Sequence, residues 1–229
     1  MSVTVFSRKA RTAASLLSFI RKARIASSLP VEEIIEIPYR IGSVTPFQVR
    51  EELTELAKVL QNAKPRRLLE IGTNRGGTFF VLCQVSAEDA KVISVDMPGA
   101  MFGDKKPKFY TEFVISRMKR PRQTYRRVVG DSHSLETLRR VEGVLCGEKL
   151  DFLFIDGDHT YNGVRQDFDM FSPLVRSGGI VGFHDIAVHP PETHCEVNRL
   201  WEEIKSNYRC REIIANPSQG WAGIGLVYV

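Results

Sequence analysis

The chain has 229 residues, of which 43% are hydrophobic and 26% are charged, and its formal net charge is +5. This length and composition fit one large globular domain with additional segments better than two full domains. No apolar run approaches the roughly 20 residues that a membrane-spanning helix needs, and the four cysteines form no CxxC pair, so we expect a cytosolic protein with reduced thiols.

The positive charge is concentrated at the N-terminus. Residues 1–30 contain six Lys or Arg and no Asp or Glu, so the rest of the chain sums to about −1. Apolar residues recur near helical spacing from Ala10 to Ala23, which predicts a basic amphipathic helix. Three interpretations compete: a helix that packs on the domain or on a partner subunit, a helix on an anionic membrane surface, and an organelle transit peptide. We divide the chain into a helical extension, residues 1–40, and a main domain, residues 41–229.

Helices and strands alternate through the main domain. Thr45, Pro46 and Gln48 have the pattern of a helix start, and Pro65 ends that helix. Short apolar runs predict strands at residues 67–71, 91–96, 125–129, 150–155, 180–183, 211–215 and 224–229. Helices are predicted around Phe80, over 161–171 and over 197–204. Such alternation predicts an α/β fold whose mostly parallel sheet has helices on both faces.

Acidic residues stand at the carboxyl ends of the first five predicted strands. They are Glu70, Asp96, Asp131, Asp156 and Asp185. Ligands of open parallel sheets bind at this edge, so the pattern indicates a ligand site. The first strand leads into a Gly-rich turn, residues 70–77, with the spacing G-x-x-x-G-G instead of the G-x-G-x-x-G of dehydrogenases. A carboxylate at Asp96 can accept both ribose hydroxyls of an adenosine.

Five segments together resemble class I S-adenosylmethionine-dependent methyltransferases: E-I-G-T-N-R-G-G, V-D-M, G-D-S, F-I-D-G-D-H-T-Y and S-G-G-I-V-G-F-H-D. More closely they resemble the group that contains macrolide-sugar O-methyltransferases and cephalosporin-hydroxylase-like proteins. The resemblance covers about residues 45–229. It implies a Rossmann-like, doubly wound, seven-stranded sheet with an antiparallel last strand. It also implies an S-adenosylmethionine site formed by Glu70, Gly72, Thr73, Asn74, Gly76, Asp96, Met97, Asp131, Ser132 and Asp156.

A metal site is expected at the ends of the fourth and fifth strands. Asp156 and Asp185 can hold a divalent cation that lowers the pKa of an acceptor hydroxyl, and His159 can take the proton as general base. Metal-dependent O-methyltransferases, which the chain resembles here, have an oxygen ligand where this sequence has His184. Imidazole favours Mn²⁺ or another transition ion over Mg²⁺. We predict Asp156, His184 and Asp185 as ligands and His159 as the catalytic base.

Structural roles remain open for several of these residues. Asp158 can cap the helix that starts near Thr160, Asp185 can form a turn, and His159 can be structural. His189 and His194 fit exposed loop positions, or a second metal set with His184.

Basic residues also gather between positions 105 and 127. They form either a solvated face or part of a lid, with residues 98–103 as its mobile segment, that attracts an acidic acceptor. No nucleic acid partner is expected, because the D/N-P-P-Y signature of base methylation and an aromatic stacking platform are both absent.

The leading functional hypothesis is a metal-assisted O-methyltransferase that acts on a hydroxyl of a sugar, glycan or glycosylated metabolite. We expect a cytoplasmic homo-oligomer, and peripheral membrane contact through the N-terminal helix stays open as an alternative. One alternative is a metal-dependent hydroxylase, although the sequence shows no convincing two-His-one-carboxylate set. Another is a non-catalytic cofactor-binding subunit.

Overall fold

The computed structural model describes residues 18–23, 25–42, 44–98 and 113–229. Residues 1–17 of the predicted basic helix and residues 99–112 of the predicted lid region lie outside this part. The elements in chain order are η1 (Ala26–Ser28), α2 (Val31–Tyr39), α3 (Arg50–Ala63), β1 (Arg67–Ile71), α4 (Gly77–Val85), β2 (Lys91–Asp96), β3 (Thr124–Val129), α6 (Leu135–Leu145), β4 (Leu150–Ile155), α7 (Tyr161–Phe171), η2 (Ser172–Leu174), β5 (Val175–His184), η3 (Pro191–Thr193), α8 (Val197–Lys205), β6 (Arg209–Ile213) and β7 (Ile224–Tyr228).

The seven strands of the described residues form one sheet in the order β3-β2-β1-β4-β5-β7-β6. Strands β1 to β5 pair in parallel, and β7 is antiparallel to both of its neighbours. The predicted Rossmann-like sheet with an antiparallel last strand is therefore confirmed. The strand order reverses between β1 and β4, and ligands of doubly wound sheets bind beyond the strand ends at such a point.

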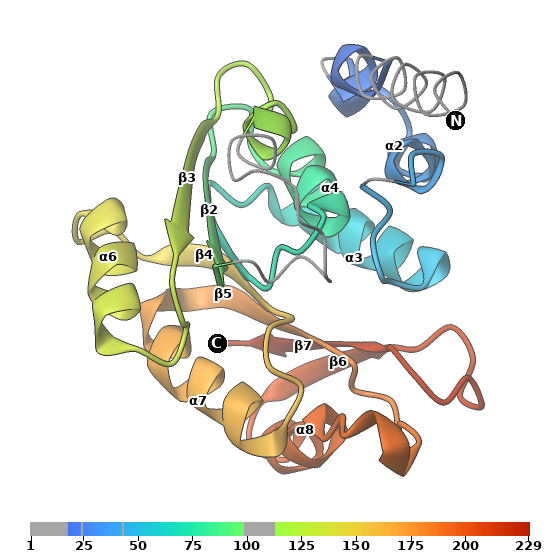
Figure 1. Ribbon diagram of the computed structural model, residues 1–229, viewed down its shortest axis with the longest axis vertical. Helices are drawn as coiled ribbons and strands as arrows, with labels where there is room; N and C mark the ends of the chain where they lie inside the picture. The colour runs from blue at the N-terminus through green and yellow to red at the C-terminus, as the bar shows by residue number, and fades with distance from the viewer. Residues whose placement is uncertain (1–17, 24, 43, 99–112) are drawn as a thin grey trace, which may run out of the picture.

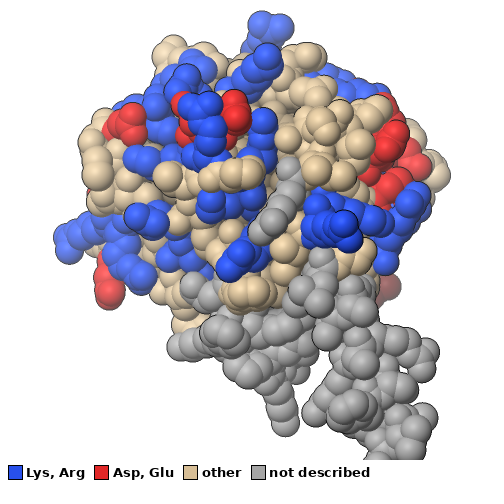
Figure 2. Space-filling model, turned by 90° about the horizontal axis from the view of Figure 1, so that it is seen from above, with Lys and Arg blue, Asp and Glu red and all other residues tan. Residues whose placement is uncertain are grey.

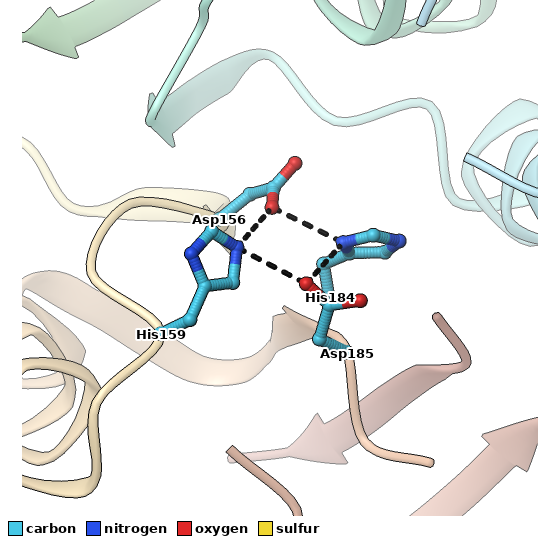
Figure 3. A group of neighbouring side chains, drawn as sticks. All are labelled: Asp156, His159, His184 and Asp185. Atoms are coloured by element: carbon cyan, nitrogen blue, oxygen red, sulfur yellow. Dashed lines mark hydrogen bonds and ion pairs between the residues drawn. The ribbon is translucent and has the colours of Figure 1, made fainter. Parts of the chain in front are cut away.

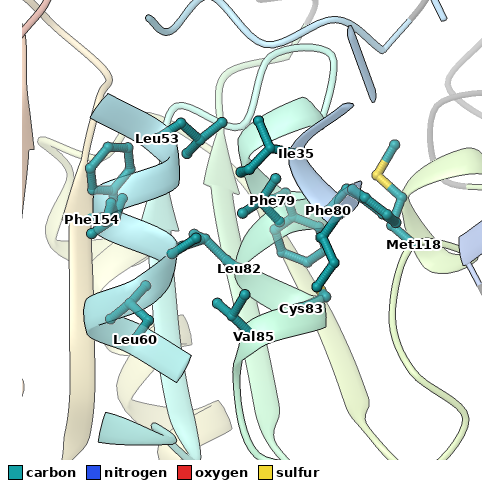
Figure 4. Close-up of a cluster of buried hydrophobic side chains, with 14 of the residues drawn as sticks. Ile35, Leu53, Leu60, Phe79, Phe80, Leu82, Cys83, Val85, Met118 and Phe154 are labelled. Atoms are coloured by element: carbon teal, nitrogen blue, oxygen red, sulfur yellow. The ribbon is translucent and has the colours of Figure 1, made fainter. Parts of the chain in front are cut away.

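Helices cover both faces of the sheet (Figure 1). Helices α2, α3 and α4 pack on one face, where every residue of α4 is buried. Figure 4 shows this core, in which Leu53 and Leu60 of α3 lie near Leu82 and Val85 of α4. Helices α6, α7 and α8 bury their apolar sides on the opposite face. The central strands are buried on both faces, as their almost continuous apolar sequences predict.

The described part of the N-terminal extension packs on the main domain. Residues 18–23 are helical, and the Phe19 and Ala23 side chains are buried in the core that α3 and α4 share. The ring of Phe19 lies 5.1 Å from that of Phe80 between centroids. Among the described residues, no helix is both long enough and apolar enough to span a bilayer.

Two predicted elements begin more than two residues away from their observed starts. Helix α3 begins at Arg50 and not at Pro46, because the hydroxyl of Thr45 donates to the carbonyl of Ile41 at 3.2 Å and thus serves the preceding turn. Strand β5 begins at Val175 and includes the predicted turn, because Gly178 adopts a left-handed φ of 72° while its N–H donates to the carbonyl of Val229 at 2.7 Å.

Candidate active site

A cavity of about 780 Å³ opens at the carboxyl edge of the parallel strands, a volume typical of small-molecule sites. Ten of the predicted site residues line it: Gly72, Asn74, Asp96, Met97, Asp131, Ser132, Asp156, His159, His184 and Asp185. The predicted residues Glu70, Thr73 and Gly76 are not on its wall. No sequence pattern pointed to several further lining residues, among them Phe47, His133 and Trp221, whereas His189, a candidate for a second metal set, also lines the cavity.

The turn after β1 forms part of the cavity wall. Gly72 has a φ of 88°, and a Cβ at this position would lie 1.9 Å from the carbonyl oxygen of Asp156. Only glycine allows β1 and β4 to approach so closely here. Asn74 is also left-handed, with a φ of 46°, and its buried Oδ1 has no hydrogen-bond partner among the described residues. The turn thus presents a polar atom that a ligand can satisfy.

Glu70 lies beneath the cavity. Its side chain is buried, and neither carboxylate oxygen has a hydrogen-bond partner within the described part of the chain. Burial raises the pKa of the Glu70 carboxyl well above its usual value, and the negative charges of Asp156 and Asp96 add to this effect. Glu70 therefore holds its proton more tightly than an ordinary glutamate does.

Asp96 at the end of β2 has a basic neighbour. A guanidinium nitrogen of Arg127 on β3 lies 3.8 Å from its Oδ2, and both side chains are less than one-tenth exposed. Burial raises the pKa of Asp96 to about 6, although the charge of Arg127 opposes this rise. Grouping Arg127 with the exposed basic residues was wrong, because its side chain is less than one-tenth exposed and lies beside Asp96.

Another basic residue of the same region also pairs with an acid. Arg122 lies 3.5 Å from Glu88, and Arg66, which lies outside the region, is 2.5 Å from the neighbouring Asp89. Figure 2 shows Lys and Arg side chains gathered over one face of the molecule, with Asp and Glu groups among them. Within the described part of the region, Arg122 and Arg127 therefore have acidic partners that lie outside it in the sequence.

His133 completes the wall near the end of β3 and lies beside buried Asp167. The Nε2 of His133 lies 3.1 Å from the carbonyl oxygen of Gly163 and 3.5 Å from Oδ1 of Asp167, a fully buried residue of α7. Burial raises the pKa of Asp167 to about 6, and hydrogen bonding to Ser132 opposes the rise. Asp167 thus lies behind the segment that contains Asp131, Ser132 and His133.

Four side chains converge at the ends of β4 and β5 (Figure 3). The Nδ1 of His184 lies 3.1 Å from Oδ1 of Asp156 and 3.1 Å from Oδ2 of Asp185. The Nε2 of His159 lies 3.4 Å and 3.1 Å from the same two oxygens. The structure therefore brings together all four residues that were predicted for the metal and the base.

The geometry of this cluster fits a metal site. Of the four approaches, only that between His159 and Asp156 has the angles of a hydrogen bond, and neither ring nitrogen of buried His184 has a hydrogen-bond partner among the described residues. Donor atoms that share a zinc-class ion, each about 2.0–2.2 Å from it, lie about 3–3.5 Å from one another. Two imidazoles and two carboxylates suit Mn²⁺, Fe²⁺ or Zn²⁺ better than Mg²⁺.

The charges within the cluster are strongly coupled. The neighbouring carboxylates, first Asp156 and then Asp185, raise the pKa of His159 to about 10. Burial disfavours the charged form of His184, but the same two carboxylates outweigh it and raise the pKa of this imidazole to about 10. Burial likewise opposes ionisation of Asp185, yet its histidine neighbours hold the pKa of its carboxyl far below the usual range. Without an ion, the two histidines are therefore cationic at neutral pH.

Distant residues orient the two carboxylates. Gln48 donates from Nε2 to Oδ2 of Asp156 at 2.9 Å, although the two are 108 positions apart in the sequence. The hydroxyl of Tyr39 in turn donates to the backbone carbonyl of Gln48 at 2.6 Å. The N–H of Ala222 donates to Oδ1 of Asp185 at 3.1 Å. Such outer partners fix the direction of metal-binding groups.

Two of the open structural roles are settled by geometry. Asp158 accepts a hydrogen bond from the N–H of Thr160, which is itself the N-cap of α7, so Asp158 stabilises the turn before the helix. His194 is exposed. The interpretation of His189 as exposed was wrong: its side chain is 8% exposed, and Nε2 lies 3.2 Å from Oδ1 of Asp185.

Known proteins are similar to this chain in sequence and in fold. Residues 69–186 match the family described as a methyltransferase domain. The uncharacterized protein y4gI of Sinorhizobium fredii is 30% identical over 142 residues, which are 62% of this chain but 15% of that protein. The uncharacterized protein R132 of Acanthamoeba polyphaga mimivirus is 36% identical over 59 residues, 25% of this chain and 27% of that protein. The chain thus spans only a small part of these relatives.

Solved structures share the fold at low sequence identity. An O-methyltransferase from Bacillus cereus in complex with SAH has a TM-score of 0.60 at 19% identity, over 87% of this chain and 90% of that one. The O-methyltransferase TomG from Streptomyces achromogenes in complex with SAM has a TM-score of 0.59 at 16% identity, over 92% and 89%. The sheet order, the antiparallel seventh strand and the cavity at the switch point define a class I methyltransferase fold. The chain belongs to the methyltransferase domain family that residues 69–186 match.

Proposed function

We propose that this chain is an S-adenosylmethionine-dependent O-methyltransferase that acts, with a divalent ion, on a hydroxyl of a sugar, glycan or glycosylated metabolite. One observation carries the proposal: the Gly-rich turn, Asp96 and the cluster of His159, His184 and two aspartates line the same cavity. The two solved relatives named above are O-methyltransferases in complex with SAM or SAH, which supports the same cofactor here.

The cofactor half of the cavity extends from β1 to β3. S-adenosylmethionine supplies a methyl group on a sulfonium, which needs little activation. Asp96 accepts the ribose hydroxyls, and Asp131 with Ser132 flanks the adenine. Asn74 offers its unsatisfied Oδ1 to the same ligand. Glu70 acts from below, through the turn, and not by direct contact with the cavity.

The acceptor half contains the metal cluster. Asp156, His184 and Asp185 hold the ion, whose positive charge lowers the pKa of an acceptor hydroxyl and of the neighbouring His159 imidazolium. His159 is the most exposed of the four side chains, at 41%, so it is the one that can reach an acceptor proton. Released from its charged form, His159 takes that proton as general base.

The rim of the cavity supports a sugar-type acceptor. Phe47, Met97 and Trp221 line the cavity and are exposed to 54%, 54% and 43%. Large apolar side chains that remain exposed around a cavity mark a binding surface. The C–H face of a sugar ring can pack on such an aromatic side chain while its hydroxyls reach the polar cluster.

The test is a mass-spectrometric assay of methyl transfer to a panel of sugars and glycosides. We expect transfer that a chelator abolishes and that Asp185→Ala also abolishes, while both leave S-adenosylhomocysteine binding largely intact. His159→Ala should keep the ion and slow turnover by about 10²–10⁴-fold. Glu192→Ala is the matched control, because Glu192 is an exposed acidic residue of the segment between β5 and α8 that also contains Asp185.

Two results would overturn parts of the proposal. Full activity in chelator, with Asp185→Ala unimpaired, would show that the strand-end acids are structural. Failure to bind S-adenosylhomocysteine in calorimetry would remove the cofactor assignment itself.

A metal-dependent hydroxylase is a second candidate function. Sequence alone could not place two histidines and a carboxylate together, but the structure places His159 and His184 beside Asp185. A two-His-one-carboxylate set with open positions is the donor set of non-haem iron oxygenases. Oxygen uptake by the Fe²⁺-loaded protein, with hydroxylated product and without S-adenosylmethionine, would favour this candidate. Methylated product without oxygen uptake would exclude it.

A further inference from the structure

A second group of metal-binding side chains lies beside the first. Donor atoms of Asp185, His189 and Cys195 all lie within 4.8 Å of one another. Asp185 follows β5 directly, and the other two belong to the segment between β5 and α8. This group combines a carboxylate, an imidazole and a thiol, which is the donor chemistry of zinc-class ions and not of Mg²⁺.

Asp185 directs its two oxygens to different partners. Its Oδ2 lies 3.1 Å from His159 and 3.1 Å from His184, whereas its Oδ1 lies 3.2 Å from Nε2 of His189. Asp185 adopts a left-handed φ of 64°, and the N–H of Ala222 fixes Oδ1 at 3.1 Å. The carboxylate is thus held between two sets of ligands.

His189 presents a polar atom that the described residues do not satisfy. Its side chain is more than nine-tenths buried, and Nε2 has no partner in hydrogen-bond geometry although it lies 3.2 Å from Oδ1 of Asp185. A buried nitrogen without a partner destabilises the fold, because it has lost its hydrogen bonds to water and gained none in return. A positive ion between these two atoms satisfies both of them, whereas the angles do not fit a direct hydrogen bond.

We propose that Asp185, His189 and Cys195 bind a second divalent ion of the zinc class, which shares the carboxylate of Asp185 with the ion at Asp156 and His184. Three protein ligands leave one position open, as in zinc sites that also bind a small ligand. Only the sharing of the Asp185 carboxylate between two ions depends on the first ion, which is part of the proposed function. The second site itself rests on its own three side chains and does not depend on methyl transfer.

The first experiment counts ions. The full chain is equilibrated with Zn²⁺, desalted, and analysed for metal per folded protein. We expect two equivalents for the wild type and one for His189→Ala and for Cys195→Ser. The exposed residues His194 and Cys146 supply matched controls, and His194→Ala and Cys146→Ser should keep two. One equivalent in the wild type, or two in Cys195→Ser and His189→Ala, would overturn the proposal.

The second experiment identifies the thiolate ligand. Its first result, the presence or absence of the band, is read from the wild type alone and needs no variant to fold. Titration of the wild type with Co²⁺ should produce an ultraviolet thiolate-to-cobalt charge-transfer band, which Cys195→Ser removes and Cys146→Ser retains. Absence of the band in the wild type contradicts the proposal. S-adenosylhomocysteine binding, measured on the same samples, reports on the proposed function separately, because that site lies at the ends of β1 to β3.

Discussion

If Asp96 binds the ribose as proposed, its carboxylate should make cofactor binding depend on pH. Burial raises its pKa to about 6, and only the ionised form can accept both ribose hydroxyls with a full negative charge. Affinity for S-adenosylhomocysteine should therefore be complete well above pH 6 and should fall as the pH drops through that value. Calorimetry at a series of pH values measures this. Asp96→Asn should weaken binding by about tenfold or more and remove the pH step; a flat wild-type profile would contradict the assignment.

Arg127 should set the position of that pH step. Its guanidinium, 3.8 Å from Asp96, favours the ionised carboxylate and so lowers the pKa of Asp96 against the effect of burial. Arg127→Met should raise this pKa and move the loss of affinity to higher pH. Arg127→Lys keeps a positive charge and serves as the control. If the pH profile of Arg127→Met coincides with that of the wild type, Arg127 does not tune the site.

Gly72 should tolerate no side chain. A Cβ there would lie 1.9 Å from the carbonyl oxygen of Asp156, so Gly72→Ala must push β1 and β4 apart or change the turn. We expect a large fall in the melting temperature and loss of S-adenosylhomocysteine binding. Gly143 is the matched control, because a Cβ at this position in α6 meets nothing within 4 Å. Gly143→Ala should stabilise the protein by about 1 kcal/mol.

At the scale of elements, helix α3 holds the loop between β6 and β7 through Glu52. This fully buried carboxylate accepts hydrogen bonds from the N–H of Ala215 at 3.0 Å, from Nε2 of Gln219 at 2.7 Å and from the N–H of Gly223 at 2.9 Å. The same loop supplies Ala222, whose N–H fixes Asp185. Glu52 thus connects the first helix of the main domain to the loop that fixes Asp185.

Removal of Glu52 should lower the stability of the fold and loosen the loop that fixes Asp185. Glu52→Ala leaves buried donors without an acceptor, which should lower the free energy of unfolding by about 3 kcal/mol or more. Denaturant unfolding measures this loss. Glu51→Ala, at the exposed neighbouring position, should change little. Equal stability of the two variants would show that the loop keeps its conformation without Glu52.

At the scale of the whole molecule, the N-terminal extension should contribute to stability but not to the cavity. Among the described residues, none that lines the cavity precedes Phe47, whereas Phe19 and Ala26 are fully buried against the domain. A chain that starts at Val31 should bind S-adenosylhomocysteine with unchanged affinity per folded molecule and melt at a lower temperature. Phe19→Ala alone should cost about 3–5 kcal/mol. An unchanged melting temperature would contradict the observed packing.

The sequence by itself determined the sheet and the edge that binds ligands. Residues 67–71, 91–96 and 150–155 were predicted as strands with the bounds that the structure has. Their runs of apolar residues are a local signal, because a central parallel strand is buried on both faces. Parallel strands place their carboxyl ends at one edge, so the amino-acid order alone was enough to expect Asp156 and Asp185 together.

Only the tertiary structure decided which side chains complete the site. Gln48 looked like part of a helix start, yet its amide binds Asp156, and Arg127 looked like a surface residue, yet it lies beside Asp96. His189 likewise turned from a loop residue into a buried neighbour of Asp185. The first two contacts join segments that are distant in the chain or adjacent strands in the sheet, whereas His189 lies four positions after Asp185 and reaches it through the fold of the loop. Local periodicity and capping patterns contain no information about such partners, which are selected only when the helices and loops pack over the strand ends.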